Sequence, residues 1–331
     1  MSTAITVFLF ALSIVIIVKG GDWFVDAATW IAEVSGIPKL IVGATVVSVA
    51  TTLPEMLVST LAAGQGKVDM SIGNAVGSVT ANIGLIMALA LIFMPSVIKR
   101  KDYLLKSLLM LGAAAIIAGI GLSGSVGLVP CLFLIAIFAV AMWDNIHAAL
   151  VAMKHGGDAA DELPEGGEAV RAKPAGREIA VNVVKFIVGA GMIVGGAELL
   201  VSTGTDLANL LGVSERIISV TLVAIGTSLP ELVTTVTAIV KKQMSLSVGN
   251  IIGANIFDLT LIMPLSCLVA GKPLPVGSEQ MMYFDLPAAL AVGLVALVPA
   301  LITKKFHRWQ GFLLLALYIA YVVLSCFVTI F

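Results

Sequence analysis

Charged residues are scarce in this chain of 331 residues, in which Asp, Glu, Lys and Arg together make up only 12%. A soluble domain carries roughly a quarter of such residues. Hydrophobic residues reach 59%, so the composition excludes an ordinary soluble protein and indicates one that crosses a membrane several times. The formal net charge of −1 gives no sign of a nucleic-acid partner, and we infer no obligate protein partner.

Cysteine and histidine are also rare, with three residues of each. The cysteines at positions 131, 267 and 326 all lie in apolar runs, and an odd number in such positions argues against a disulfide framework. The histidines are too scattered along the chain for a metal cluster. We therefore expect no resident metal and no cofactor.

Apolar runs fill most of the chain. A membrane-spanning helix needs about 20 apolar residues, which predicts an all-α membrane protein of ten transmembrane helices. The predicted spans are 4–32, 38–64, 69–95, 103–121, 127–150, 179–208, 214–240, 246–268, 283–302 and 308–329. We do not expect the first span to be a cleaved signal peptide, because it lacks a basic leader.

One long polar segment, 154–178, is rich in glycine and proline and interrupts the apolar runs. It divides the chain into a first five-helix half (1–153), a cytoplasmic linker (154–178) and a second five-helix half (179–331). Acidic residues within the linker could form a regulatory ion site, although a solvated linker is the simpler interpretation.

A sequence repeat relates the two halves. Thr51-Thr52-Leu53-Pro54-Glu55 recurs 176 residues later as Thr227-Ser228-Leu229-Pro230-Glu231, and Asn82 has its counterpart in Asp258 at the same offset. Five spans per half is an odd number, so the two repeats should enter the membrane from opposite sides. Such inverted repeats are typical of secondary transporters, whose binding site lies near the midplane. Lys and Arg gather in the loops of one side, which predicts that both termini lie outside.

Within each repeat, a proline directly precedes a glutamate inside an apolar run. Pro54 and Pro230 lack an N–H, so the carbonyls of Ala50 and Gly226 lose their helical partners and the helices should break. Freed carbonyls and ionisable side chains are both costly in the membrane interior unless they face a cavity or an ion. Carboxylate and carbonyl oxygens are hard ligands that suit Ca²⁺ or Na⁺. We therefore expect a cation site built from both halves.

A second apolar segment in each half carries a Gly-Asn-x-x-Gly motif and ends at Asn82 or at Asp258. Glycines four residues apart let helix backbones approach closely, and we expect them to let the broken helices cross at the site, while the asparagines of the motif cap or bridge helix ends. With the carboxylates of Glu55 and Glu231, these segments could supply the six to eight oxygens that Ca²⁺ takes. The same oxygens could instead hold Na⁺, and this competition is the physical basis of exchange.

The repeated Thr-Ser-Leu-Pro-Glu and Gly-Asn-x-x-Gly-x-Asn-x-x-Asp patterns resemble the alpha repeats of the cation/Ca²⁺ exchanger superfamily, and above all its prokaryotic sodium/calcium exchangers. The resemblance covers residues 36–86 and 212–262. It implies ten transmembrane helices in an inverted repeat, with helices 2, 3, 7 and 8 broken, in the inner membrane of a prokaryotic cell. It also implies an antiporter, not an enzyme, that exchanges several Na⁺ for one Ca²⁺ electrogenically by alternating access.

The resemblance also implies which residues bind the ions. Glu55 and Glu231 would be the central ligands, and the carbonyls of Thr51 and Thr227 would bind Ca²⁺. Asn82 and Asp258 would lie at the middle position. Hydroxyl groups and backbone atoms near these residues would bind Na⁺: Thr51, Thr52, Thr227, Ser228, Ser78, Ser48 and Ala224.

Two positions depart from the family pattern. Ala254 stands where the family usually has serine, and Val79 where it usually has asparagine. Ala254 removes a hydroxyl from an expected Na⁺ site, so the coupling ion and its stoichiometry stay open.

Close buried carboxylates also bind protons readily, which keeps an H⁺/Ca²⁺ or other divalent cation antiporter as the alternative. That alternative ranks second because the Gly-Asn-Ala-x-Glu signature of proton/calcium exchangers is absent. Glu231 argues against potassium-dependent relatives, which tend to have Asp at this position.

Two further hypotheses do not account for the duplication. An intramembrane hydrolase could use membrane carboxylates as its catalytic pair, but it would need no second, inverted copy of the helix breaks. A passive channel could conduct cations, but it has no use for the alternating gates that inverted repeats supply.

Overall fold

The computed structural model describes residues 3–95, 100–154, 175–210, 224–276, 279 and 281–328, and these ranges are almost entirely helical. The helical elements before the polar segment are α1 (Thr3–Ser35), α2 (Lys39–Val42), η1 (Gly43–Val47), α3 (Ser48–Gly64), α4 (Val68–Ala81), η2 (Asn82–Met87), α5 (Ala88–Phe93), α6 (Arg100–Ser123) and α7 (Leu128–Lys154), where η denotes a π-helix. Those after it are α8 (Gly176–Leu210), α10 (Ala224–Thr227), α11 (Leu229–Val240), α12 (Met244–Phe257), η5 (Asp258–Ile262), α13 (Met263–Ala270), η6 (Met281–Asp285), α14 (Leu286–Thr303) and α15 (Arg308–Val328).

One feature was not expected in an all-helical protein. Two short strands, β1 (Ser125–Val126) and β2 (Leu274–Pro275), pair antiparallel. Val276 extends the contact by donating its N–H to the carbonyl of Gly124 at 2.9 Å. The pairing therefore ties the turn after α6 to the segment that follows α13.

Eight helical runs within the described ranges are long and apolar enough to cross a membrane. They coincide with all of the predicted spans except the fourth and the seventh. The fourth corresponds to α6, whose apolar part, Leu104–Ile120, is shorter, and the seventh lies partly outside the described residues, with α10 and α11 at its end. Most of the predicted linker also lies outside them. The length and apolar character of these runs fit a multi-pass integral membrane protein.

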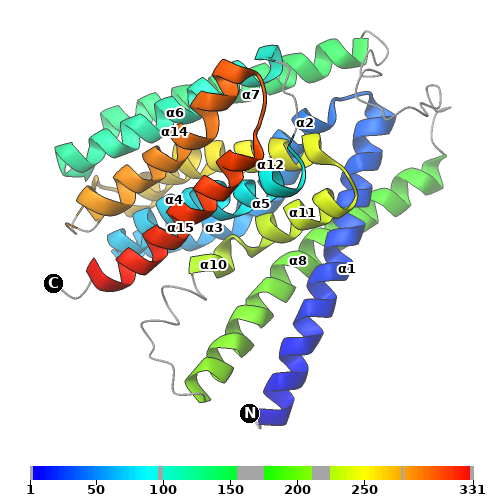
Figure 1. Ribbon diagram of the computed structural model, residues 1–331, viewed down its shortest axis with the longest axis horizontal. Coiled ribbons are helices and arrows are strands. Elements are labelled where there is room, and N and C mark those ends of the chain that lie inside the picture. The colour runs from blue at the N-terminus through cyan, green and yellow to red at the C-terminus, as the bar shows by residue number, and fades with distance from the viewer. Residues whose placement is uncertain are drawn as a thin grey trace.

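The helices form two groups (Figure 1). α1 and α8 lie side by side and are steeply inclined to most of the other long helices. Their backbones touch, because a Cβ atom added at Gly189 would lie 2.8 Å from the N atom of Phe24. In the second group α12 packs against α2, η1 and α3, while α14 packs against α6 and α15.

The outer surface of the helices is apolar. Large side chains such as Phe8, Ile187 and Leu268 are exposed. On a soluble protein so much exposed apolar surface would mark an interaction site, whereas in a bilayer these side chains meet lipid. The polar residues of the repeat are instead buried between helices, which is where a membrane protein keeps them.

The expected helix breaks take a different form in the two halves. α3 runs through Pro54 without interruption, and the chain departs from α-helical geometry at the π-helical segments η1 and η2 instead. The second and third predicted spans are therefore distorted and not broken at these points. For the second span, which contains Pro54, the reason is that a proline removes one hydrogen bond and a helix can bend around that loss. In the second half α10 ends at Thr227 and α11 begins at Leu229, so a break precedes Pro230 as expected. The eighth predicted span is distorted in the same way as the third, because the π-helical segment η5 lies between α12 and α13.

Candidate cation site

Two glutamates from distant parts of the chain meet in the interior of the helix bundle. Glu55 lies on α3 and Glu231 in the first turn of α11, and each is only 1% exposed. Their carboxyl groups interact electrostatically. Thr52, one turn before Glu55, donates its hydroxyl to Oε1 of Glu231 at 3.4 Å. The proline–glutamate elements of the two repeats therefore face one another.

Asn82 and Asp258 form a second contact between the repeats. Asn82 is the first residue of η2 and Asp258 the first of η5. The Nδ2 atom of Asn82 donates to Oδ2 of Asp258 at 3.4 Å. Asp258 is fully buried, and its carboxyl group interacts electrostatically with those of Glu55 and Glu231. Three carboxyl groups and one amide thus gather in one region.

Asn250 has a larger part in this region than its sequence position indicated. Its Oδ1 accepts a hydrogen bond from Thr51 at 3.3 Å, and its backbone carbonyl lies 3.1 Å from the hydroxyl oxygen of Ser48. Asn74, its counterpart in the first repeat, donates to the carbonyl of Glu55 at 3.2 Å and to Ser59 at 2.9 Å. The asparagines of both motifs therefore bridge helices, with Asn250 next to two predicted ion ligands.

The glycines of the second repeat permit this approach. A Cβ atom at Gly253 would lie 2.7 Å from both the Cα and the carbonyl O of Ala44, and one at Gly249 would overlap the carbonyl of Leu40. Backbone therefore rests on backbone where α12 crosses α2 and η1. Only a residue without a side chain fits at such a crossing.

The structure shows fewer contacts for the four remaining predicted ligands. Ser78 on α4 and Ser228, which precedes α11, are buried, and within the described ranges their hydroxyls have no hydrogen-bond partner. Ala224 and Thr227 lie in α10. No hydrogen bond among the described residues joins either of them to the carboxylates.

Sequence reasoning gave no role to Asn255. This residue is fully buried, and both polar atoms of its side chain lack a partner in the described part of the chain. The signal was present in the sequence, because Asn255 is the second asparagine of the Gly-Asn-x-x-Gly-x-Asn-x-x-Asp motif.

The oxygen atoms gathered in this region suit a hard cation as its ligands. Several buried oxygens have no hydrogen-bond donor among the described residues: both of Glu55, Oε2 of Glu231, Oδ1 of Asp258, Oδ1 of Asn82 and the hydroxyls of Ser78 and Ser228. Burying a carboxylate costs on the order of several kcal/mol unless it is paired. No three acidic, histidine or cysteine side chains in the described ranges form a compact metal-ligand cluster. An ion shared here would therefore need hydroxyl, amide and carbonyl oxygens beside the carboxylates, which is the mixed shell that Ca²⁺ accepts.

Comparisons with known proteins cover nearly the whole chain. A family model described as "Sodium/calcium exchanger protein" matches residues 5–146 and 181–327. An uncharacterized membrane protein of Methanocaldococcus jannaschii is 32% identical over 319 residues, which cover 94% of each chain. The sodium/calcium exchanger MaX1 of Methanosarcina acetivorans is 29% identical over 361 residues, which cover 96% of this chain and 97% of the relative. A solved structure of the sodium-calcium exchanger NCX_Mj, soaked with Na⁺ and Sr²⁺, superposes with a TM-score of 0.78 at 30% identity and covers 97% of this chain and 99% of that one.

Proposed function

The chain belongs to the sodium/calcium exchanger protein family, and we propose that it exchanges Na⁺ for Ca²⁺ across a membrane by alternating access. The observation that carries the proposal is the meeting of Glu55 and Glu231 in the buried interior. Two carboxylates neutralise one Ca²⁺, and the neutral oxygens around them can complete its coordination. The family is one of ion transporters, so we propose no enzymatic reaction.

The ion ligands are proposed as follows. Ca²⁺ binds the carboxylates of Glu55 and Glu231 and the carbonyls of Thr51 and Thr227. Na⁺ binds the same region through hydroxyl and backbone oxygens contributed by Ser48, Thr51, Thr52, Ser78, Ala224, Thr227 and Ser228, with Asn82 and Asp258 at the middle position. Because both ions use the same carboxylates, binding of one excludes the other, which couples their movements.

An inverted repeat of ten spans gives this site its two gates. Asn82 and Asp258, which contact one another, are 176 residues apart, as are Glu55 and Glu231. Equivalent residues of two repeats meet only near the axis that relates the repeats, so these contacts support a pseudo-twofold axis through the site. With five spans on each side of a cytoplasmic linker, the two halves have opposite orientations and both termini lie outside. Each half then closes the site from one side of the membrane.

The transport reaction can be tested directly in vesicles that contain the purified protein. We expect an outward Na⁺ gradient to drive Ca²⁺ uptake at least about tenfold faster than an equal K⁺ gradient or a pH gradient, since the gradient of the coupling ion supplies the free energy. Uptake driven by the pH gradient and indifferent to Na⁺ would replace the proposal with H⁺/Ca²⁺ exchange. Vesicles without protein serve as the control.

Ala254 is expected to limit Na⁺ binding. It occupies the register position of Ser78 in the second repeat and is fully buried. Ala254→Ser adds one oxygen ligand, so we expect the Na⁺ concentration at half-maximal exchange to fall by about fivefold, equivalent to ~1 kcal/mol. The matched control is Ala113→Ser on α6, which is equally buried. An unchanged Na⁺ titration for Ala254→Ser would count against Na⁺ at this position.

A further inference from the structure

The π-helical segment η1 is held in place by side chains. In a π-turn the backbone hydrogen bonds span five residues instead of four, which disturbs the pairing of neighbouring carbonyls. Here the carbonyl of Ile41 accepts the hydroxyl of Thr45 at 2.6 Å, and that of Gly43 accepts the hydroxyl of Ser48 at 2.7 Å. The carbonyl of Ala44 accepts Nδ2 of Asn145 at 3.5 Å. Thr45 and Ser48 belong to the same helical run, whereas Asn145 reaches η1 from α7.

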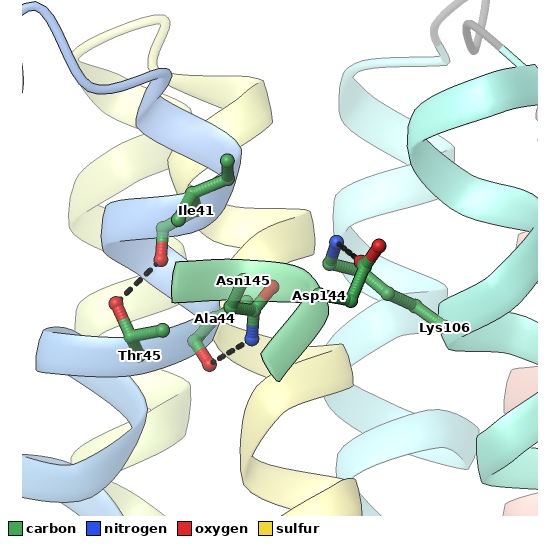
Figure 2. Close-up of polar contacts among 6 residues, drawn as sticks. All are labelled: Ile41, Ala44, Thr45, Lys106, Asp144 and Asn145. Atoms are coloured by element: carbon green, nitrogen blue, oxygen red, sulfur yellow. Dashed lines mark hydrogen bonds and ion pairs between the residues drawn. The ribbon is translucent and has the colours of Figure 1, made fainter. Parts of the chain in front are cut away.

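Asn145 is itself fixed by its neighbour. Asp144 forms an ion pair with Lys106 of α6, with 2.8 Å between Oδ2 and Nζ. The side chain of Lys106 is only 4% exposed, and a buried charge is costly in the membrane interior unless it has a partner. Figure 2 shows Asp144 turned toward Lys106 while Asn145 points toward the carbonyl of Ala44. The ion pair thus ties α7 to α6 at the residue directly before Asn145, whose side chain reaches η1.

The position of η1 bears on the cation site. Ala44 lies between Asn145 on one helix and Gly253 of α12, where a Cβ atom would meet the Ala44 backbone. Ser48 follows η1 directly and begins α3, the helix that carries Thr51, Thr52 and Glu55. A shift of the Ala44 carbonyl would therefore move Ser48, a proposed Na⁺ ligand, before it moved the carboxylates.

We propose that Asn145 is a positioning residue of the exchanger, which holds the Ala44 carbonyl so that Ser48 stays in register for Na⁺. This role rests on the proposed Na⁺/Ca²⁺ exchange. Asn145 acts through η1 and does not touch the ion. Its loss should therefore weaken Na⁺ binding while the Glu55–Glu231 pair still binds Ca²⁺.

The test is Asn145→Leu, which keeps the branched shape of the side chain and removes the donor. In vesicles we expect the half-saturating Na⁺ concentration to rise about five- to tenfold, as for the loss of one buried hydrogen bond, with the half-saturating Ca²⁺ concentration within twofold of the parent and the maximal rate retained. Asn145→Gln, which keeps an amide donor, should restore most of the Na⁺ affinity. Equal changes for both ions, or an unchanged Na⁺ titration, would overturn the proposal.

A matched control and a second variant keep the test decisive. Asn182→Leu also removes a bond from an asparagine Nδ2 to a backbone carbonyl, that of Glu178 at 3.0 Å, but this bond lies within α8 at an exposed position, so the change should leave both titrations unchanged. If Asn145→Leu fails to fold, Lys106→Met combined with Asp144→Leu removes the ion pair without leaving a buried charge. This double variant should also raise the half-saturating Na⁺ concentration selectively, and an unchanged value would count against the proposal.

Hydrogen–deuterium exchange separates this inference from the proposed function. Peptides that cover residues 40–50 should exchange faster in Asn145→Leu than in the parent or in Asn182→Leu, whichever ion the protein transports. If the parent protein shows no Na⁺-driven uptake, the proposed function fails and the exchange rates alone decide whether Asn145 holds η1. If the parent transports and the Na⁺ titration of Asn145→Leu is unchanged, only the role of Asn145 fails.

Discussion

Glu55→Gln and Glu231→Gln are each expected to abolish Na⁺-driven Ca²⁺ uptake, with a loss of at least about 100-fold, the upper end of what even outer-shell changes cost at metal sites. Each substitution keeps the shape of the side chain and removes one of the two charges proposed to neutralise Ca²⁺. Both oxygens of Glu55 and Oε2 of Glu231 lack hydrogen-bond donors among the described residues, so little else in that part of the chain depends on the negative charge. The measurement is radioactive Ca²⁺ uptake into vesicles with matched protein content.

The same two variants should remain folded. Removing an uncompensated buried charge relieves a desolvation cost, so we expect the melting temperature without Ca²⁺ to stay equal or to rise, and the stabilisation by added Ca²⁺ to disappear. Glu33→Gln is the matched control, because Glu33 is partly exposed and pairs with Lys39 at 3.6 Å. Uptake near the parent rate by either site variant would remove the assignment of Glu55 and Glu231 as the central ligands.

Gly249→Ala is expected to produce the second large effect, a loss of both stability and transport. The added Cβ atom would lie 2.9 Å from the carbonyl carbon of Leu40 and would overlap its oxygen. Because the obstacle is backbone and not a flexible side chain, α12 would have to move away from α2. Overpacking of this kind costs about 1–3 kcal/mol, and the movement would also displace Asn250 from Ser48 and Thr51.

Thermal unfolding in detergent and Ca²⁺ uptake in vesicles measure the two effects of Gly249→Ala. Gly112→Ala on α6 is the control, since a Cβ atom there would meet only Ile137 at an ordinary 3.9 Å. In a helix with free space, alanine is favoured over glycine by about 1 kcal/mol, so the control should be neutral or stabilising. A Gly249→Ala protein with the parent melting temperature and uptake rate would show that the crossing is not as tight as the Cβ contacts indicate.

Much of the fold and of the candidate site could be predicted from the sequence. Hydrophobic length alone placed the eight described runs that are long enough to span a membrane, because insertion into lipid depends on the residues of each segment. The repeat singled out Glu55, Glu231, Asn82 and Asp258, since acidic and amide groups inside apolar runs need a reason to be there. The local consequence of proline was predicted less well: α3 continues through Pro54, whereas the chain breaks before Pro230.

The sequence by itself determined that this protein lies in a membrane, that it carries two related acidic elements, and which family it resembles. Only the tertiary structure decided which groups meet: Thr52 with Glu231, Asn82 with Asp258, Asn250 with Ser48 and Thr51, and Asn145 with the π-helical backbone at Ala44. The reason is physical. Hydropathy and helix breaking are properties of short segments, whereas these contacts join residues 101 to 202 positions apart and depend on how closely α12 and α7 pack against η1 and α3.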